Sequence, residues 1–261
     1  MSYHLPTTIE GVLEALDDII ADTQSRNSPL GVFAYVYRRT TAQIKTAMED
    51  GAFEDAARME RLDVTFANLY IQAYREYRAG EMPSQAWAIA FTGEQDRLAL
   101  IQHLLLGMNA HINLDLGVAA ARIMEGTDIE ALGPDYHKVN DILAGLTIEM
   151  QQRLGRVSPL LFLLDWIGQR SDEKVANFSI KVAREQSWRI ARELATLPPL
   201  ERPARIERVD TSVTELSSIL KQPKSRLLRT VLGIIRRFES SDLQRVIEVL
   251  KSSADFQVRE P

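Results

Sequence analysis

The sequence contains no cysteine, and this absence excludes several classes of site at once. Disulfide frameworks, thiolate zinc sites, iron–sulfur clusters and cysteine nucleophiles all require thiol sulfur. Histidine is also scarce, with only 4 in 261 residues. Any metal ion bound by this chain must therefore take its ligands from histidine, aspartate or glutamate.

Several catalytic motifs are missing as well. The sequence has no His-Glu-x-x-His, no Gly-x-Ser-x-Gly, no phosphate-loop pattern and no Glu-x-x-His. These absences argue against zinc metalloproteases, α/β-hydrolases, phosphate-loop nucleotide hydrolases and ferritin-like di-iron proteins.

Excess positive charge and long apolar runs are lacking too. The formal net charge is -5, so we expect no nucleic-acid partner. The apolar stretch "SPLLFLLDWIG" is too short to span a membrane and is interrupted by Asp165. The first residues have no basic region of the kind found in secretory signals. We therefore expect a cytoplasmic protein, with peripheral membrane contact as an open alternative.

The pattern of apolar residues predicts helices almost throughout. Apolar side chains recur at helical spacing, glycine or proline follows most of these segments, and no stretch alternates like a strand. The fold class is therefore all-α, a multi-helix bundle of roughly ten or more helices with no sheet. The predicted helices cover 9–25, 29–49, 53–79, 92–108, 113–126, 134–155, 171–197, 204–221, 225–238 and 240–251.

A proline-rich stretch, "LPPLERPAR", is the best linker in the chain. It predicts a main helical domain over 1–197 and a C-terminal helical subdomain over 204–261 packed on it. A single continuous domain is the alternative.

The segment "HLLLGMNAHINLD" contains two of the four histidines, His103 and His111. On a continuous helix, residues eight apart differ by about 80° in direction and by roughly 12 Å in height. These two histidines can share one ion only if the helix breaks between them, and Gly107 would permit a break.

Two His-x-x-x-Asp pairs follow. Asp115 lies four residues after His111, and Asp141 lies four residues after His137. On neighbouring helices, these pairs would place four ligands around a common point, a set that suits zinc, manganese or iron(II). Two other interpretations stay open: Asp141 orients His137 as a general base, or the pairs are ordinary ion pairs and core hydrogen bonds.

The order of these residues resembles the zinc-dependent phospholipase C and P1-type nuclease superfamily, whose members are all-helical phosphodiesterases. The resemblance spans about residues 99–143 and is carried by His103, the step "LLLGMNAH", His111, His137 and Asp141. It implies that His111, His137 and Asp141 hold one divalent ion, most simply zinc, with His103 at a neighbouring site. Gly107 stands where the superfamily has an aspartate, and the histidine spacings differ, so at most one ion is implied.

The whole chain also resembles an uncharacterised bacterial family of helical proteins with segments like "HLLLGMNAHINLDLG". That similarity implies fold and kinship, and it implies no activity.

A long helix over 53–79 presents Asp63 and several aromatic residues near one side. We interpret this stripe mainly as core packing, with a small-molecule pocket as the alternative. Asp63 is included because any metal would need another carboxylate nearby.

The stretch 221–237, "KQPKSRLLRTVLGIIRR", contains six basic residues and no acid, together with an apolar face. Such a helix can lie on an anionic membrane surface or pack against acids of the same chain.

Two hypotheses of different classes follow, and whether the protein is an enzyme stays open. In the first, the chain is a metal-dependent hydrolase of a phosphoester or lipid-like substrate. His111, His137 and Asp141 hold the ion, His103 or Asp115 steers the bound water, and Asn109 and Asp63 complete the pocket. In the second, it is a non-catalytic helical binding or scaffold protein whose basic helix faces a membrane or a partner.

Overall fold

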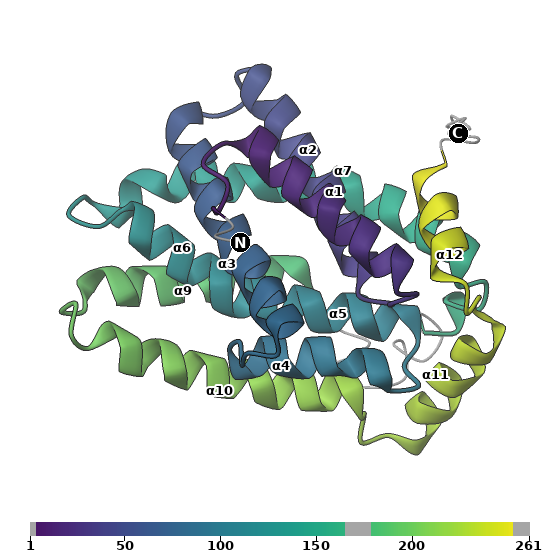
Figure 1. The fold of residues 1–261 in the computed structure, drawn as a ribbon. Coiled ribbons are helices and arrows are strands. Elements are labelled where there is room, and N and C mark those ends of the chain that lie inside the picture. The colour runs from purple at the N-terminus through teal and green to yellow at the C-terminus, as the bar shows by residue number, and fades with distance from the viewer. Residues whose placement is uncertain (1–3, 165–178, 253–261) are drawn as a thin grey trace.

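A computed structural model describes residues 4–164 and 179–252, and these residues form helices without any strand, which confirms the all-α prediction (Figure 1). Short 3-10 turns occur at η1 (Gly93–Gln95) and η3 (Ile129–Leu132), and η2 (His111–Asp115) is a π-helical turn. The α-helices are α1 (Ile9–Ser25), α2 (Gly31–Glu49), α3 (Ala56–Ala79), α4 (Gln85–Thr92), α5 (Leu100–Ala110), α6 (Leu116–Ile123), α7 (Gly133–Val157), α9 (Ile180–Thr196), α10 (Arg202–Lys221), α11 (Arg226–Phe238) and α12 (Leu243–Lys251).

Most helix ends fall close to their predicted positions. Gly51 and Gly80 follow α2 and α3 with φ of 72° and 78°, the left-handed conformation that glycine adopts without steric cost. The helices predicted over 92–108 and 113–126 were wrong in two respects. Thr92 ends α4, and α5 begins at Leu100. In addition, α5, η2 and α6 form one continuous run. The predicted start at 171 lies outside the described residues, and α9 is described from Ile180 onward.

The run from α5 through η2 to α6 is the central element of the fold. Figure 1 shows it passing through the middle of the molecule, with α1 and α2 on one side and α9 and α10 on the other. Among the described residues, Leu100–Ile123 is the one helical stretch long and apolar enough to cross a membrane. Its most apolar part is 78% buried inside the protein, as in the core helix of a globular fold.

Two glycines allow neighbouring helices to approach this central run closely. A Cβ atom at Gly107 would lie 2.5 Å from the ring of Phe33 on α2. A Cβ atom at Gly117 would lie 2.9 Å from the backbone carbonyl oxygen of Ser187 on α9. The helix does not break at Gly107, and this glycine instead provides room for an aromatic ring.

Buried carboxylates from later helices satisfy backbone N–H groups at the starts of earlier ones. Asp210 of α10 accepts hydrogen bonds from the backbone N–H groups of Gln85 and Ala86, at 2.8 and 2.9 Å. Glu239, just after α11, accepts from the N–H group of Leu100 at 3.0 Å. The first N–H groups of a helix have no partner within the helix, so these carboxylates cap α4 and α5.

The C-terminal helices share the core of the rest of the chain. Val213 of α10, Leu228 of α11 and Val246 of α12 belong to one hydrophobic cluster with residues of α1, α2 and α5. The boundary proposed between 1–197 and 204–261 therefore does not separate two hydrophobic cores in the described residues.

Replacement of Gly117 by alanine should destabilise the protein. The added methyl group would meet a backbone oxygen that cannot rotate away, so we expect the free energy of unfolding to fall by about 1–3 kcal/mol. Urea unfolding followed by circular dichroism measures this change.

Gly145→Ala on α7 is the matched control, because nothing lies within 4 Å of its added Cβ. We expect this variant to be more stable by about 0.5–1 kcal/mol, the difference in helix propensity. Equal effects of the two substitutions would contradict close packing at Gly117.

Candidate functional site

The π-helical turn brings His111 and Asp115 into contact. In η2 the backbone N–H group of Leu116 donates to the carbonyl oxygen of His111, five residues back instead of four. Such turns occur frequently at functional sites. The Nδ1 atom of His111 lies 3.2 Å from the Oδ2 atom of Asp115, so the predicted one-turn spacing does produce a pair.

Burial disfavours the charged form of both groups. Both side chains are almost completely buried, which lowers the pKa of His111 and raises the pKa of Asp115 well beyond their ordinary ranges. The indole Nε1 of Trp87 also donates to Oδ2 of Asp115, at 2.9 Å. With Nδ1 facing this carboxyl group, Nε2 of His111 is left without a hydrogen-bond partner among the described residues.

Aromatic side chains fix the orientation of the His111 ring. Phe66 stacks on it with 3.6 Å between ring centroids and an interplanar angle of 8°. Tyr37 meets it edge to face at 4.3 Å. The imidazole is thus held in a rigid, water-poor environment on one wall of a cavity.

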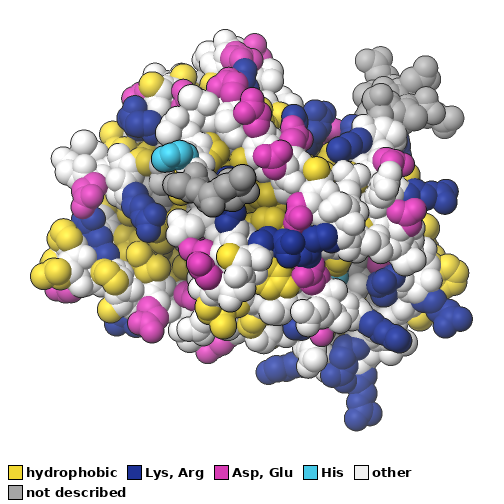
Figure 2. Space-filling model, in the orientation of Figure 1, with side chains coloured by type: hydrophobic (Ala, Val, Ile, Leu, Met, Phe, Trp, Pro, Cys, Tyr) yellow, Lys and Arg dark blue, Asp and Glu magenta, His cyan; other side chains and the backbone are white. Residues whose placement is uncertain are grey.

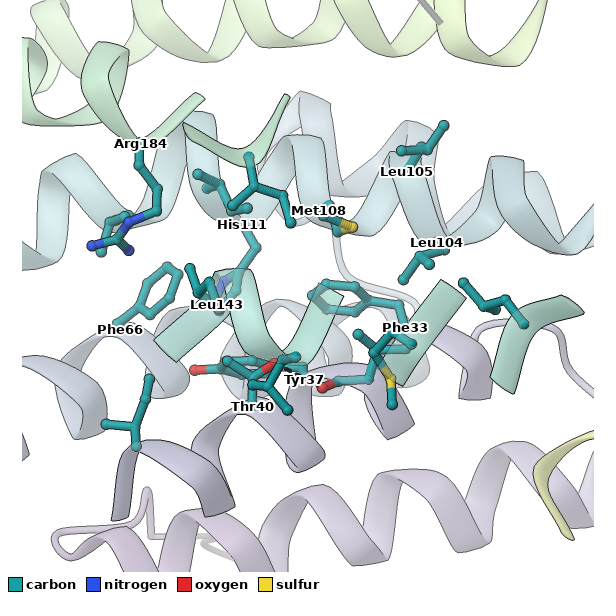
Figure 3. A pocket seen from close by; sticks show the side chains of 18 of the residues that line it. Phe33, Tyr37, Thr40, Phe66, Leu104, Leu105, Met108, His111, Leu143 and Arg184 are labelled. Carbon is teal, nitrogen blue, oxygen red and sulfur yellow. Dashed lines mark hydrogen bonds between the residues drawn. The ribbon is translucent and has the colours of Figure 1, made fainter. Parts of the chain in front are cut away.

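The cavity has a volume of about 260 Å³ and lies between the central run and α2, α3, α7 and α9 (Figure 3). Most of its lining is apolar, including Leu104, Leu105 and Met108 from α5. Figure 3 shows His111, Phe66 and Arg184 toward one end of the drawn pocket and Leu104 and Leu105 toward the other. The cavity is therefore apolar along most of its length and polar at one end.

Asp63 and Tyr37 add further polar atoms to this lining. Oδ2 of Asp63 is buried and has no hydrogen-bond partner in the described part of the chain, and the buried hydroxyl group of Tyr37 lies beside Thr41. Burial, helped by the charge of Glu60, raises the pKa of Asp63 to about 7. Asp63 is consequently neutral in mildly acidic solution and ionises near neutral pH.

Arg184 of α9 is the most unusual lining residue. It is 6% exposed, donates to the side chain of Asn140 and to the backbone oxygen of Tyr136, and lies over the ring of Tyr136. It forms no ion pair with a carboxylate of the described residues, and burial lowers its pKa. A buried guanidinium without a counter-charge is costly, so this group is well placed to receive an anion.

The other predicted site residues lie elsewhere. His103 is buried on α5 outside the cavity lining, and burial, followed by the charge of Arg236, lowers its pKa to about 4. The side-chain amide of Asn109 donates to Ser217 and to the backbone of Val213, which ties the central run to α10.

The three predicted metal ligands are not brought together. His111 is buried in the core, whereas His137 and Asp141 are exposed on α7, where Asp141 pairs with Lys138 at 3.3 Å. Across residues 4–164 and 179–252, no group of three or more histidine, aspartate or glutamate side chains is arranged to hold a metal ion. The described donor set does not fit the proposed ion.

Sequence reasoning found His111, Asp115 and Asp63 and missed Arg184. A signal for Arg184 was present, because it lies four residues after Ile180 and four before Trp188 on the apolar side of an amphipathic helix. A charge at such a position must be buried or must distort the packing. A search for charged residues on the apolar side of a predicted helix would therefore have found Arg184.

Comparison with known proteins identifies a family for this chain, and no activity is known for that family. The model of a family of unknown function matches residues 9–223 of the chain. Searches of curated proteins and of solved structures found no match. The resemblance to the phospholipase C and P1-type nuclease superfamily receives no support from these comparisons.

The buried carboxyl group of Asp63 predicts a pH-dependent stability. The unfolded chain releases this proton near pH 3.8 and the folded chain near pH 7, so the folded state retains an extra proton between these values. The contribution of Asp63 to the free energy of unfolding therefore falls as the pH rises from about 4 to about 7. Asp63→Asn should remove this part of the pH dependence, a difference of roughly 2–4 kcal/mol.

Urea unfolding of both proteins across this pH range tests the prediction. Asp18→Asn, at an exposed carboxylate of α1, is the control and should leave the wild-type profile unchanged. A profile that Asp63→Asn does not alter would show that Asp63 titrates normally.

Proposed function

The chain belongs to DUF5995, a family of unknown function, and from its own geometry we propose that it is a helical binding protein for an amphipathic, lipid-like small molecule. The ligand occupies the cavity beside the central run. Its apolar body lies along Leu104, Leu105 and Met108, and its polar head group faces Tyr37 and His111.

The apolar lining and the volume of the cavity support the first part of this proposal. Protein interiors are close-packed, and voids much larger than a water molecule are few. This cavity, about 260 Å³ in volume and lined largely by leucine, isoleucine and methionine side chains, leaves room between the packed helices for a small molecule. Ligand sites typically combine this kind of wall with a small number of polar groups.

The unpartnered polar atoms support the second part, and they are the observation that carries the proposal. Nε2 of His111 and Oδ2 of Asp63 are both buried without partners in the described residues. Leaving a buried polar group unsatisfied costs about 1–3 kcal/mol. A head group that hydrogen-bonds these atoms would recover much of that cost.

Arg184 favours an acidic head group, such as a carboxylate. An anion beside the guanidinium would supply the counter-charge that the described residues lack. Asp63 would oppose the same anion once ionised, because like charges repel in a low-dielectric site. Affinity for a carboxylate should therefore weaken as the pH rises through about 7, where Asp63 loses its proton.

Dodecanoate should bind the wild-type chain and displace a fluorescent naphthalene sulfonate probe from the cavity. Met108→Trp places a bulky ring within the lining and should weaken binding by about tenfold or more. Met82→Trp is the matched control, because Met82 is 82% exposed and lies outside the cavity. Equal affinities of the two variants would contradict binding in this cavity.

Arg184→Gln tests the head group. We expect it to weaken dodecanoate binding by about tenfold and to leave dodecanol binding almost unchanged, because only the carboxylate carries charge. A purely structural role of Arg184 would weaken both ligands equally. Isothermal titration calorimetry measures both affinities.

The metal-dependent hydrolase remains the alternative hypothesis, and metal analysis separates it from the binding protein. Because His111 is buried and His137 is exposed on α7, we expect substoichiometric zinc in protein purified without chelator. We also expect His137→Ala to bind dodecanoate like the wild type. Stoichiometric zinc that disappears in both His111→Ala and His137→Ala would instead favour the hydrolase.

A further inference from the structure

Helix α11 has one broad apolar face, and only part of that face is buried. Its inner face, with Leu228, Val231, Leu232 and Ile235, is buried in the core. Three large apolar side chains remain on the outside: Leu227 is 52% exposed, Ile234 40% and Phe238 62%. Packing within the described part of the chain therefore covers only part of this apolar face.

The three exposed side chains form a stripe. They lie seven and four residues apart, so at about 100° per residue their directions fall within a sector of roughly 40°. No other described helix carries three exposed large apolar residues. We call Leu227, Ile234 and Phe238 the outer stripe of α11.

Basic side chains occupy the solvent-facing side of α11, away from its buried face and next to the outer stripe. Lys224, Arg226, Arg229 and Arg237 are exposed, and none forms an ion pair within the described part of the chain. Figure 2 shows Lys and Arg side chains gathered at the end of the molecule where Figure 1 places α11. The formal net charge of the chain is -5, so this positive region is a local feature against an acidic background.

We propose that α11 docks on an anionic lipid bilayer. The outer stripe enters the boundary between head groups and acyl chains, and the neighbouring basic groups contact lipid phosphates. Arginine and lysine suit this position, because their apolar stems lie along the bilayer surface while their charges remain in the head-group layer. None of the cavity-lining residues belongs to α11, so this surface is separate from the proposed ligand site.

Charge and shape favour a bilayer over an acidic protein. The outer stripe lies on a single helix, with basic side chains on its solvent-facing side. A protein partner of ordinary affinity needs a larger complementary patch with a well-packed centre. A fluid bilayer provides both an apolar layer and mobile anionic groups without such complementarity.

Vesicle flotation with the full chain tests the proposal. We expect binding to vesicles of phosphatidylcholine with phosphatidylglycerol and little binding to phosphatidylcholine alone. Arg226→Glu with Arg237→Glu should reduce the partition coefficient by at least about tenfold. Leu227→Ser with Phe238→Ser should reduce it by about tenfold without altering the charge. Both pairs change exposed side chains, and thermal unfolding confirms that the variants remain folded.

Arg61→Glu with Arg189→Glu is the matched control, with the same change in net charge at exposed positions of α3 and α9. It should retain near wild-type binding. An equal loss in the control would show that net charge alone drives adsorption, and absence of binding to anionic vesicles would overturn the proposal. Dodecanoate binding by the vesicle-defective variants distinguishes failure of this surface from failure of the cavity.

Discussion

The buried carboxyl group of Asp115 is the interaction on which the site depends. It accepts a hydrogen bond from Trp87 on α4 and faces His111 one π-helical turn earlier, so a single side chain connects the central run to a neighbouring helix and orients an imidazole. An ordinary α-helical turn would give these two residues a different register relative to the surrounding helices. The consequence is an imidazole that lines the cavity with Phe66, Tyr37 and Asp63 and whose Nε2 has no hydrogen-bond partner among the described residues.

The sequence was sufficient for most of the fold because helices depend on local signals. Apolar spacing and terminal glycines such as Gly51 and Gly80 are short-range patterns, and they located α1, α2 and α3 within a few residues. The prediction of two separate helices in place of the continuous run of α5, η2 and α6 was wrong. A π-helical turn inside an apolar run has no local sequence signature comparable to a glycine or proline stop. Gly107 illustrates the same limit: its role is set by Phe33, which lies far away in the sequence.

The candidate site was only partly predictable for a related reason. Spacing of four residues correctly paired His111 with Asp115, since both lie on one helical run. The same rule says nothing about which faces of separate helices meet, and His137 and Asp141 lie on the exposed side of α7. Long-range packing decides whether a polar residue faces a cavity, solvent or another helix. For that reason Asn109 holds α10 in place, while Arg184, which drew no attention in the sequence, lines the cavity.

The carboxylate caps of α4 and α5 also constrain how the chain can fold during its synthesis. The capping residues Asp210 and Glu239 follow the N–H groups they satisfy by 125 and 139 residues. The ribosome therefore completes the central run long before it makes the capping carboxylate. Until then, the first N–H groups of α4 and α5 are hydrated or frayed. Loop closure over such distances slows folding and prolongs exposure of apolar surface. The starts of α4 and α5 thus gain these caps only after α10 and the residue that follows α11 have been synthesised.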